Sequence, residues 1–126
     1  MAGPAAADSL VHVDMWDKSD GTMGFTLSTA EVPAGKVTFE LANVSTVMEH
    51  EFLIVKIDLE PAQFPMDADG TGVDEDKLAG VDEYGDVHKG ESATWTTDVT
   101  PGNYLLFCNI EGHFGAGMWA KLTVTP

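Results

Sequence analysis

A glycine-rich loop lies between two predicted β-strands near the end of this chain, in residues 104–124. Residues 104–107 are Tyr-Leu-Leu-Phe, a short apolar run that predicts a buried strand. Residues 119–124 alternate in character, which predicts a second strand. The intervening glycines at 112, 115 and 117 allow tight turns at little steric cost. Two strands are therefore expected to clamp both ends of the loop.

Three side chains in this loop offer metal-binding donor atoms: Cys108, His113 and Met118. The only cysteine directly follows the apolar run, so its thiol is expected at the rim of the core. A thiolate, an imidazole and a thioether together suit copper that alternates between Cu(I) and Cu(II). A second histidine would complete a trigonal His₂Cys site with a weak axial Met. His50 is the candidate, so the predicted copper ligands are His50, Cys108, His113 and Met118.

The chain resembles the cupredoxins, through Lys36-Val-Thr-Phe-Glu-Leu-Ala-Asn43, His50-Glu-Phe52 and the Cys-x₄-His-x₄-Met loop. The loop spacing is similar to that of auracyanin-like and rusticyanin-like members and of small periplasmic copper-binding cupredoxins. The resemblance covers most of residues 31–125. It implies an eight-stranded Greek-key β-sandwich that binds one copper ion through the four predicted ligands. It also implies a periplasmic or otherwise extracytoplasmic location and electron transfer with protein redox partners.

Two neighbours of the predicted ligands depart from the pattern of the family. In plastocyanin-like and azurin-like members the first ligand His is usually followed by Asn, and the Cys by Ser or Thr, and these two side chains tie the ligand strands together. Here the two positions hold Glu51 and Asn109. We expect the tie to survive with its roles exchanged, the Asn109 amide bonding to the strand of Glu51. A nearby carboxylate could also stabilise Cu(II), and the Glu51 backbone N–H is a candidate hydrogen-bond donor to the Cys108 sulfur.

Alternating apolar positions elsewhere predict an all-β fold. The further expected strands cover residues 10–16, 24–28, 36–43, 50–57 and 92–99. We predict one domain over residues 1–126, a Greek-key β-sandwich of seven to eight strands. Residues 59–90 interrupt the pattern with prolines, glycines and carboxylates and are predicted to form a long acidic loop. The apolar residues expected to pin this loop against the sandwich are Phe64, Met66, Val73, Leu78 and Val81.

The chain is strongly acidic, with 21 Asp and Glu against 6 Lys and Arg and a formal net charge of −15. Nucleic-acid binding needs a basic surface and is therefore excluded. A basic protein partner would be attracted, although the same charge could simply keep the protein dissolved. No apolar stretch reaches the length of about 18 residues that a membrane span needs. We expect a monomer without a membrane span, and residues 1–8 predict a mature N-terminus or an artificial start, because they lack signal-peptide features.

Other candidate sites are weaker. Residues 67–78 imitate the start of a calcium-binding loop, but Leu78 stands where a bidentate Glu is required, so a solvated acidic loop is the preferred interpretation. His12 and His88 have no Cys or Met at ligand spacing and are predicted to lie on the surface.

Two classes of function fit the predicted site. One is an electron carrier. The other is a protein for copper tolerance, storage or delivery, in which methionines such as Met48 would pass on Cu(I). The absence of a dense Met or His tract favours the carrier. An enzyme would need a second copper centre with additional histidines, so we predict no enzymatic activity.

Overall fold

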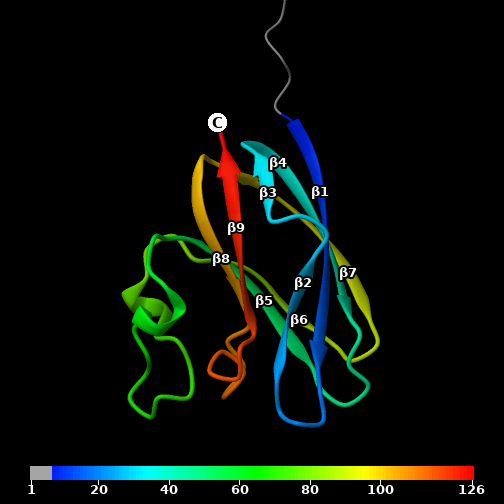
Figure 1. The fold of residues 1–126 in the computed structure, drawn as a ribbon, viewed down its shortest axis with the longest axis vertical. Helices are drawn as coiled ribbons and strands as arrows, with labels where there is room; N and C mark the ends of the chain where they lie inside the picture. The colour runs from blue at the N-terminus through cyan, green and yellow to red at the C-terminus, as the bar shows by residue number, and fades with distance from the viewer. Residues whose placement is uncertain (1–6) are drawn as a thin grey trace, which may run out of the picture.

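The computed structural model describes residues 7–126 and consists of two β-sheets packed face to face (Figure 1). The four-stranded sheet has the order β2-β1-β4-β7. Its strands are β1 (Ala7–Asp17), β2 (Met23–Leu27), β4 (Gly35–Asn43) and β7 (Ser92–Val99). The five-stranded sheet has the order β3-β9-β8-β5-β6. Its strands are β3 (Glu31–Pro33), β5 (His50–Lys56), β6 (Asp82–Val87), β8 (Gly102–Phe107) and β9 (Trp119–Thr125).

The architecture confirms the predicted all-β sandwich. β1 pairs with β4 and β3 pairs with β9 in parallel, and the other pairs are antiparallel. Residues 7–126 form nine strands, whereas seven to eight were expected. Residues 1–6, part of the segment interpreted as a mature N-terminus or an artificial start, lie outside the described residues.

Two strands, β3 and β6, were not predicted from the sequence. β3 has only three residues and pairs with the end of β9. β6 lies inside the segment predicted to be an acidic loop, and most of its side chains are exposed. It forms because its backbone pairs with β5, and its polar sequence carries no alternation that could signal this pairing. The acidic segment before it is therefore shorter than expected and comprises residues 57–81, with short 3₁₀ turns at Pro61–Gln63 and Glu75–Lys77.

The main core lies between the sheets. Alternate residues of β1 point inward, so Val11, Val13 and Met15 are fully buried, whereas the His12 side chain is exposed and paired with Glu40. Burial of an aliphatic or aromatic side chain contributes about 1.5–3 kcal/mol. The same core cluster includes the Cys108 and Met118 side chains, both fully buried. The residues at both ends of the glycine-rich loop are thus part of the sandwich core.

A second core lies on the outer face of the five-stranded sheet. Leu53 and Phe107 point away from the first core and are covered by the segment 57–81, which is the green segment at the left of Figure 1. From this segment Phe64 and Val73 are buried, both 4% exposed. Partly buried side chains that pack against this core include Met66, Leu78 and Val81. The expectation that apolar residues pin the acidic segment is therefore confirmed.

Candidate metal centre

The glycine loop (residues 108–118) leaves the end of β8 and returns to the start of β9. The Cys108 N–H donates to the Met118 carbonyl at 3.1 Å, which extends the β8–β9 pairing into the loop. Gly112 (φ +80°) and Gly117 (φ +103°) have left-handed conformations that other residues rarely adopt. A Cβ atom at Gly117 would also lie only 3.2 Å from the carbonyl oxygen of Met23 in β2. The local sequence therefore folds the loop back over the end of the sandwich.

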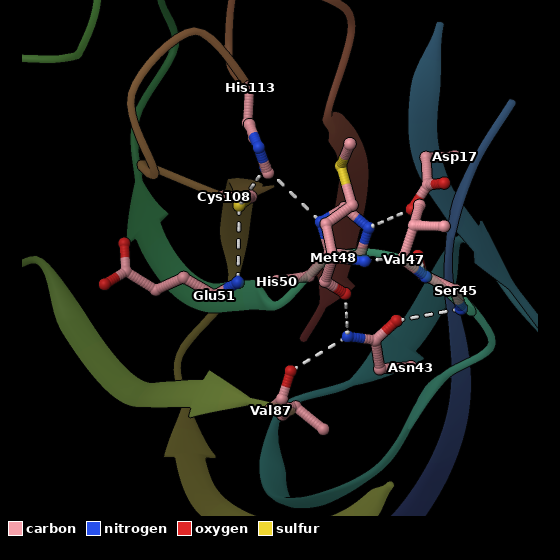
Figure 2. A network of polar contacts seen from close by, with 10 residues as sticks. All are labelled: Asp17, Asn43, Ser45, Val47, Met48, His50, Glu51, Val87, Cys108 and His113. Atoms are coloured by element: carbon pink, nitrogen blue, oxygen red, sulfur yellow. Dashed lines mark hydrogen bonds and ion pairs between the residues drawn. The ribbon is translucent and has the colours of Figure 1, made fainter. Parts of the chain in front are cut away.

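Three of the predicted ligands converge there. His50 is the first residue of β5, Cys108 follows β8, and His113 lies in the middle of the glycine loop. The Cys108 Sγ is 3.4 Å from the His113 Nδ1, and the His50 Nδ1 is 3.3 Å from the same atom. One donor atom from each residue lies within 4.8 Å of the others. Figure 2 shows the three side chains pointing toward one another.

The chemistry of this donor set fits a metal cation. Burial raises the pKa of the Cys108 thiol to about 11, although a hydrogen bond from the Glu51 backbone N–H to Sγ, 3.3 Å long, acts in the opposite direction. A bound cation would compensate the thiolate charge and displace the thiol proton. Burial and the proximity of the His50 imidazole lower the pKa of His113, which favours the neutral ring that can donate a lone pair to a metal. The predicted hydrogen bond from the Glu51 backbone N–H to the Cys108 sulfur is therefore confirmed.

The fourth predicted ligand, Met118, is held beside Cys108 by the backbone pairing between them. Its side chain is fully buried in the same core cluster as Cys108. This placement is compatible with an axial thioether, and the assignment of Met118 as a ligand stays a prediction.

A carboxylate that was not predicted from the sequence also contacts the centre. The Asp17 Oδ2, at the end of β1, lies 2.8 Å from the His50 Nε2 (Figure 2). Burial alone would raise the pKa of Asp17, but hydrogen bonds from Ser45 and His50 outweigh it and lower the pKa below its usual value. Asp17 is far from His50 in sequence and belongs to the opposite sheet, so no local motif signals the contact.

The segment that leads into His50 is fixed by Asn43, the last residue of β4. Its side-chain amide donates to the carbonyls of Met48 (3.0 Å) and Val87 (2.9 Å), and its oxygen accepts from the Ser45 N–H (3.0 Å). Asn43 is only 2% exposed. The direction in which the chain enters β5, and hence the position of His50, depends on this buried amide.

The predicted tie between Glu51 and Asn109 forms with different atoms. The Asn109 backbone N–H donates to the Glu51 carboxylate at 3.2 Å, whereas the Asn109 side chain does not reach the Glu51 strand. It binds the acidic segment instead, exchanging two hydrogen bonds with the Val73 backbone and donating to Glu75. The expectation that the side-chain amide would bond to the Glu51 strand was therefore wrong. Burial and the nearby Glu83 raise the pKa of Glu51 to about 7.

The acidic segment also braces the glycine loop directly. The Gly112 N–H donates to the Thr71 carbonyl at 2.8 Å. The ring centroids of Phe64 and Phe114 lie 5.4 Å apart, and those of Phe114 and Phe107 lie 5.8 Å apart. This aromatic cluster holds the residue next to His113 against the outer core.

The other candidate residues lie elsewhere. His12 and His88 are exposed as predicted, and they pair with Glu40 and Glu49. The carboxylates of Asp67 and Asp69 accept hydrogen bonds from their own loop. This arrangement agrees with a solvated acidic loop.

A two-sheet sandwich with a His-Cys-His cluster at one end has the architecture of a cupredoxin. The family model for copper binding proteins of the plastocyanin/azurin family matches residues 11–125, and the chain belongs to this family. Its cofactor is copper, and His50, Cys108 and His113 are positioned to hold one ion.

Solved structures of cupredoxins share the fold. Auracyanin B has 23% identity and a TM-score of 0.65, covering 99% of this chain and 94% of that chain. Auracyanin from Roseiflexus castenholzii has 24% identity and a TM-score of 0.63, and the match covers 97% of this chain and 100% of that chain. Rusticyanin from Thiobacillus ferrooxidans has 22% identity and a TM-score of 0.62, and the match covers 98% of this chain and 86% of that chain. A search of curated proteins gave no significant match.

Proposed function

We propose that the protein carries single electrons between protein redox partners through one copper ion held by His50, Cys108, His113 and Met118. When bound, copper supplies a Cu(I)/Cu(II) couple, which accepts one electron from a reduced partner and gives it to an oxidised one. The observation that carries the proposal is the convergence of two imidazoles and a thiol within 4.8 Å. This set of soft and borderline donors suits both oxidation states of copper.

The surroundings of the ligands favour a site that changes little during electron transfer. Cys108 and Met118 are joined by a backbone hydrogen bond and are part of the core. The Glu51 N–H stabilises negative charge on the Cys108 sulfur. The sulfur then donates less electron density to copper, which favours Cu(I) over Cu(II). Because packing and hydrogen bonds gather the donors, little reorganisation is required at each transfer.

His113 is the proposed exit for the electron. It is 9% exposed, whereas His50, Cys108 and Met118 are 0% exposed. A shallow, largely apolar hollow lies between the glycine loop and the acidic segment, and its lining includes the two residues that follow His113. The hollow is lined by Pro61, Ala62, Phe64, Met66, Phe114, Gly115 and Trp119. A small apolar surface formed in part by the same loop as the proposed exit suits the brief, small-area contacts of redox partners.

The partner is proposed to be a protein with a basic docking surface. The net charge of −15 would attract such a partner and steer it at low ionic strength. An extracytoplasmic location is proposed from the family resemblance. In residues 7–126 no helix is long and apolar enough to cross a membrane.

The copper-delivery alternative has less structural support. A Cu(I) transfer route would need accessible thioethers, but Met15 and Met23 are buried in the main core. Met48 and Met66 are partly buried and pack against the two cores. We therefore favour an electron carrier over a copper-delivery protein. From the family we also propose that it catalyses no reaction of its own.

Copper loading followed by voltammetry tests the proposal. The protein should bind one copper per chain, develop the intense visible absorption of a copper–thiolate bond, and show a reversible one-electron couple. It should also retain Cu(I) when challenged with a Cu(I) chelator. Rapid loss of copper to the chelator, together with slow electron exchange, would favour delivery over electron transfer.

A further inference from the structure

We propose that Asp17 is a positioning residue for the metal centre, which holds the His50 ring in one tautomer and contributes negative charge that favours Cu(II). The inference rests on the proposed function, because the effect of this charge on the potential requires copper bound by His50. It concerns a residue 33 positions before His50 in the sequence.

The contact joins the two sheets at the end of the sandwich where the glycine loop lies. Asp17 ends β1 and is paired with Met23 of β2, whereas His50 begins β5 in the other sheet. The distance from the Asp17 Oδ2 to the His50 Nε2 is 2.8 Å (Figure 2). The side chains of His50 and Asp17 are 0% and 9% exposed, so water competes little for this hydrogen bond.

The hydrogen bond selects the tautomer of His50. An ionised carboxylate only accepts hydrogen bonds, so the His50 Nε2 must carry the ring hydrogen. Nδ1 then keeps its lone pair, and this is the nitrogen that lies 3.3 Å from the His113 Nδ1. The partner of the outer nitrogen thus leaves the inner nitrogen free to bind a metal, as carboxylates do for ligating histidines in general.

The charge of Asp17 is directed at the ligand. Its carboxylate oxygen Oδ2 contacts the His50 ring directly. The neighbouring Lys18 extends over the Trp16 ring, with its Nζ 5.2 Å from the ring centroid. A carboxylate that accepts a hydrogen bond from a ligating imidazole increases the donor strength of the ring. It also attracts Cu(II) more strongly than Cu(I), because the attraction grows with the charge of the ion.

Two neutralising substitutions on the same strand separate this effect from overall charge. Asp17→Asn keeps the shape and an acceptor oxygen but removes the charge. Asp14→Asn removes one charge from the exposed face of β1 and serves as the control. If the loss of the Asp17 charge weakens Cu(II) binding about tenfold and leaves Cu(I) binding unchanged, the potential rises by about 59 mV. We expect a rise of this order for Asp17→Asn and a much smaller one for Asp14→Asn.

The tautomer can be measured in the metal-free protein. Long-range ¹H–¹⁵N NMR spectra of the wild type should show His50 protonated at Nε2 alone. Asp17→Ala should give a mixture of tautomers, and Asp17→Asn should restore the single one. The wild-type spectrum decides this point even if the alanine variant does not fold.

The outcomes are distinct. The charge effect is overturned if Asp17→Asn binds copper and its reduction potential differs from that of the wild type by no more than the potential of Asp14→Asn does. A wild-type His50 protonated at Nδ1 overturns the positioning role. A wild-type protein without a reversible copper couple overturns the proposed function and the charge effect together, and the metal-free spectrum still decides the positioning role.

Discussion

The side chain of Asn109 holds the backbone of Val73 through two hydrogen bonds, with its oxygen 2.7 Å from the Val73 nitrogen and its nitrogen 3.0 Å from the Val73 oxygen. This pair attaches the acidic segment to the residue that follows Cys108. Since Val73 is only 4% exposed, water cannot readily replace the lost partners if Asn109 is truncated. The acidic segment is therefore part of the support of the metal centre.

Asn109→Ala should lower the free energy of unfolding by about 1–3 kcal/mol, because it leaves polar backbone groups of Val73 without partners. Urea denaturation measures the loss. Asn103→Ala is the matched control, since the Asn103 side chain is exposed and binds only Asp58 at the surface. The control should stay within about 0.5 kcal/mol of the wild type. Equal losses in the two variants would contradict a supporting role for Asn109.

Cys108→Ser should abolish the visible absorption of the copper-loaded protein, because that absorption arises from the bond between copper and the thiolate. The metal-free variant should remain folded, since the sandwich core consists mainly of other side chains. Absorption spectroscopy and circular dichroism measure the two effects. His88→Gln, which changes an exposed histidine, should keep the colour. A Cys108→Ser protein that stayed coloured would refute the ligand assignment.

Met118→Leu should retain copper and raise the reduction potential, because the weak axial thioether donor to Cu(II) is lost. The swap nearly conserves volume, so the cost in stability should be below about 1.5 kcal/mol. Voltammetry and copper analysis provide the readouts. Met15→Leu, at another fully buried core position, should leave the potential unchanged. Complete loss of copper from Met118→Leu would show that Met118 is more than a weak axial ligand.

The stability of the metal-free protein should depend on pH through Glu51, whose pKa is raised from 4.5 to about 7 by burial and by Glu83. Between these values the folded protein keeps a proton that the unfolded chain has released. The contribution of Glu51 to stability is therefore fully present below pH 4.5 and is lost as the pH rises to about 7. One pKa unit corresponds to about 1.4 kcal/mol, and solvent screening of this partly exposed group reduces the expected total to about 1–2 kcal/mol.

Denaturation at several pH values checks this dependence against two variants. Glu51→Gln should flatten the profile in this range, because the amide does not titrate. Glu31→Gln, at an exposed position of β3, should leave the slope as in the wild type. Identical slopes for the wild type and Glu51→Gln would show that Glu51 does not hold the proton.

The rate of electron transfer to a basic partner should fall as salt is added. The net charge of −15 attracts a cationic protein at long range, and the screening length shrinks from about 30 Å at 0.01 M salt to about 10 Å at 0.1 M. Stopped-flow mixing with a basic cytochrome as probe measures the rate. An anionic inorganic oxidant should show the opposite trend. A rate with the basic probe that does not change with salt would argue against electrostatic docking.

The strands β5 and β7 were predictable from the pattern of their apolar residues. Residues 92–99 form β7 with the predicted bounds, and the predicted strand at residues 50–57 ends one residue earlier, at Lys56. β6 was not predictable in this way, since its exposed side chains carry no pattern and its formation depends on pairing with β5.

The spacing of Cys108, His113 and Met118 is local, so the sequence alone determined which atoms one short loop could present to a metal, and the alternating strands determined that a sandwich would carry it. The tertiary structure decided which distant groups meet that loop. Asp17 reaches His50 from the opposite sheet, and Asn109 turns to Val73 rather than to the strand of Glu51. Periodicity reports which side of a strand is buried, whereas the partner of a buried polar group depends on how separate elements pack, and that is set only when the whole chain has folded.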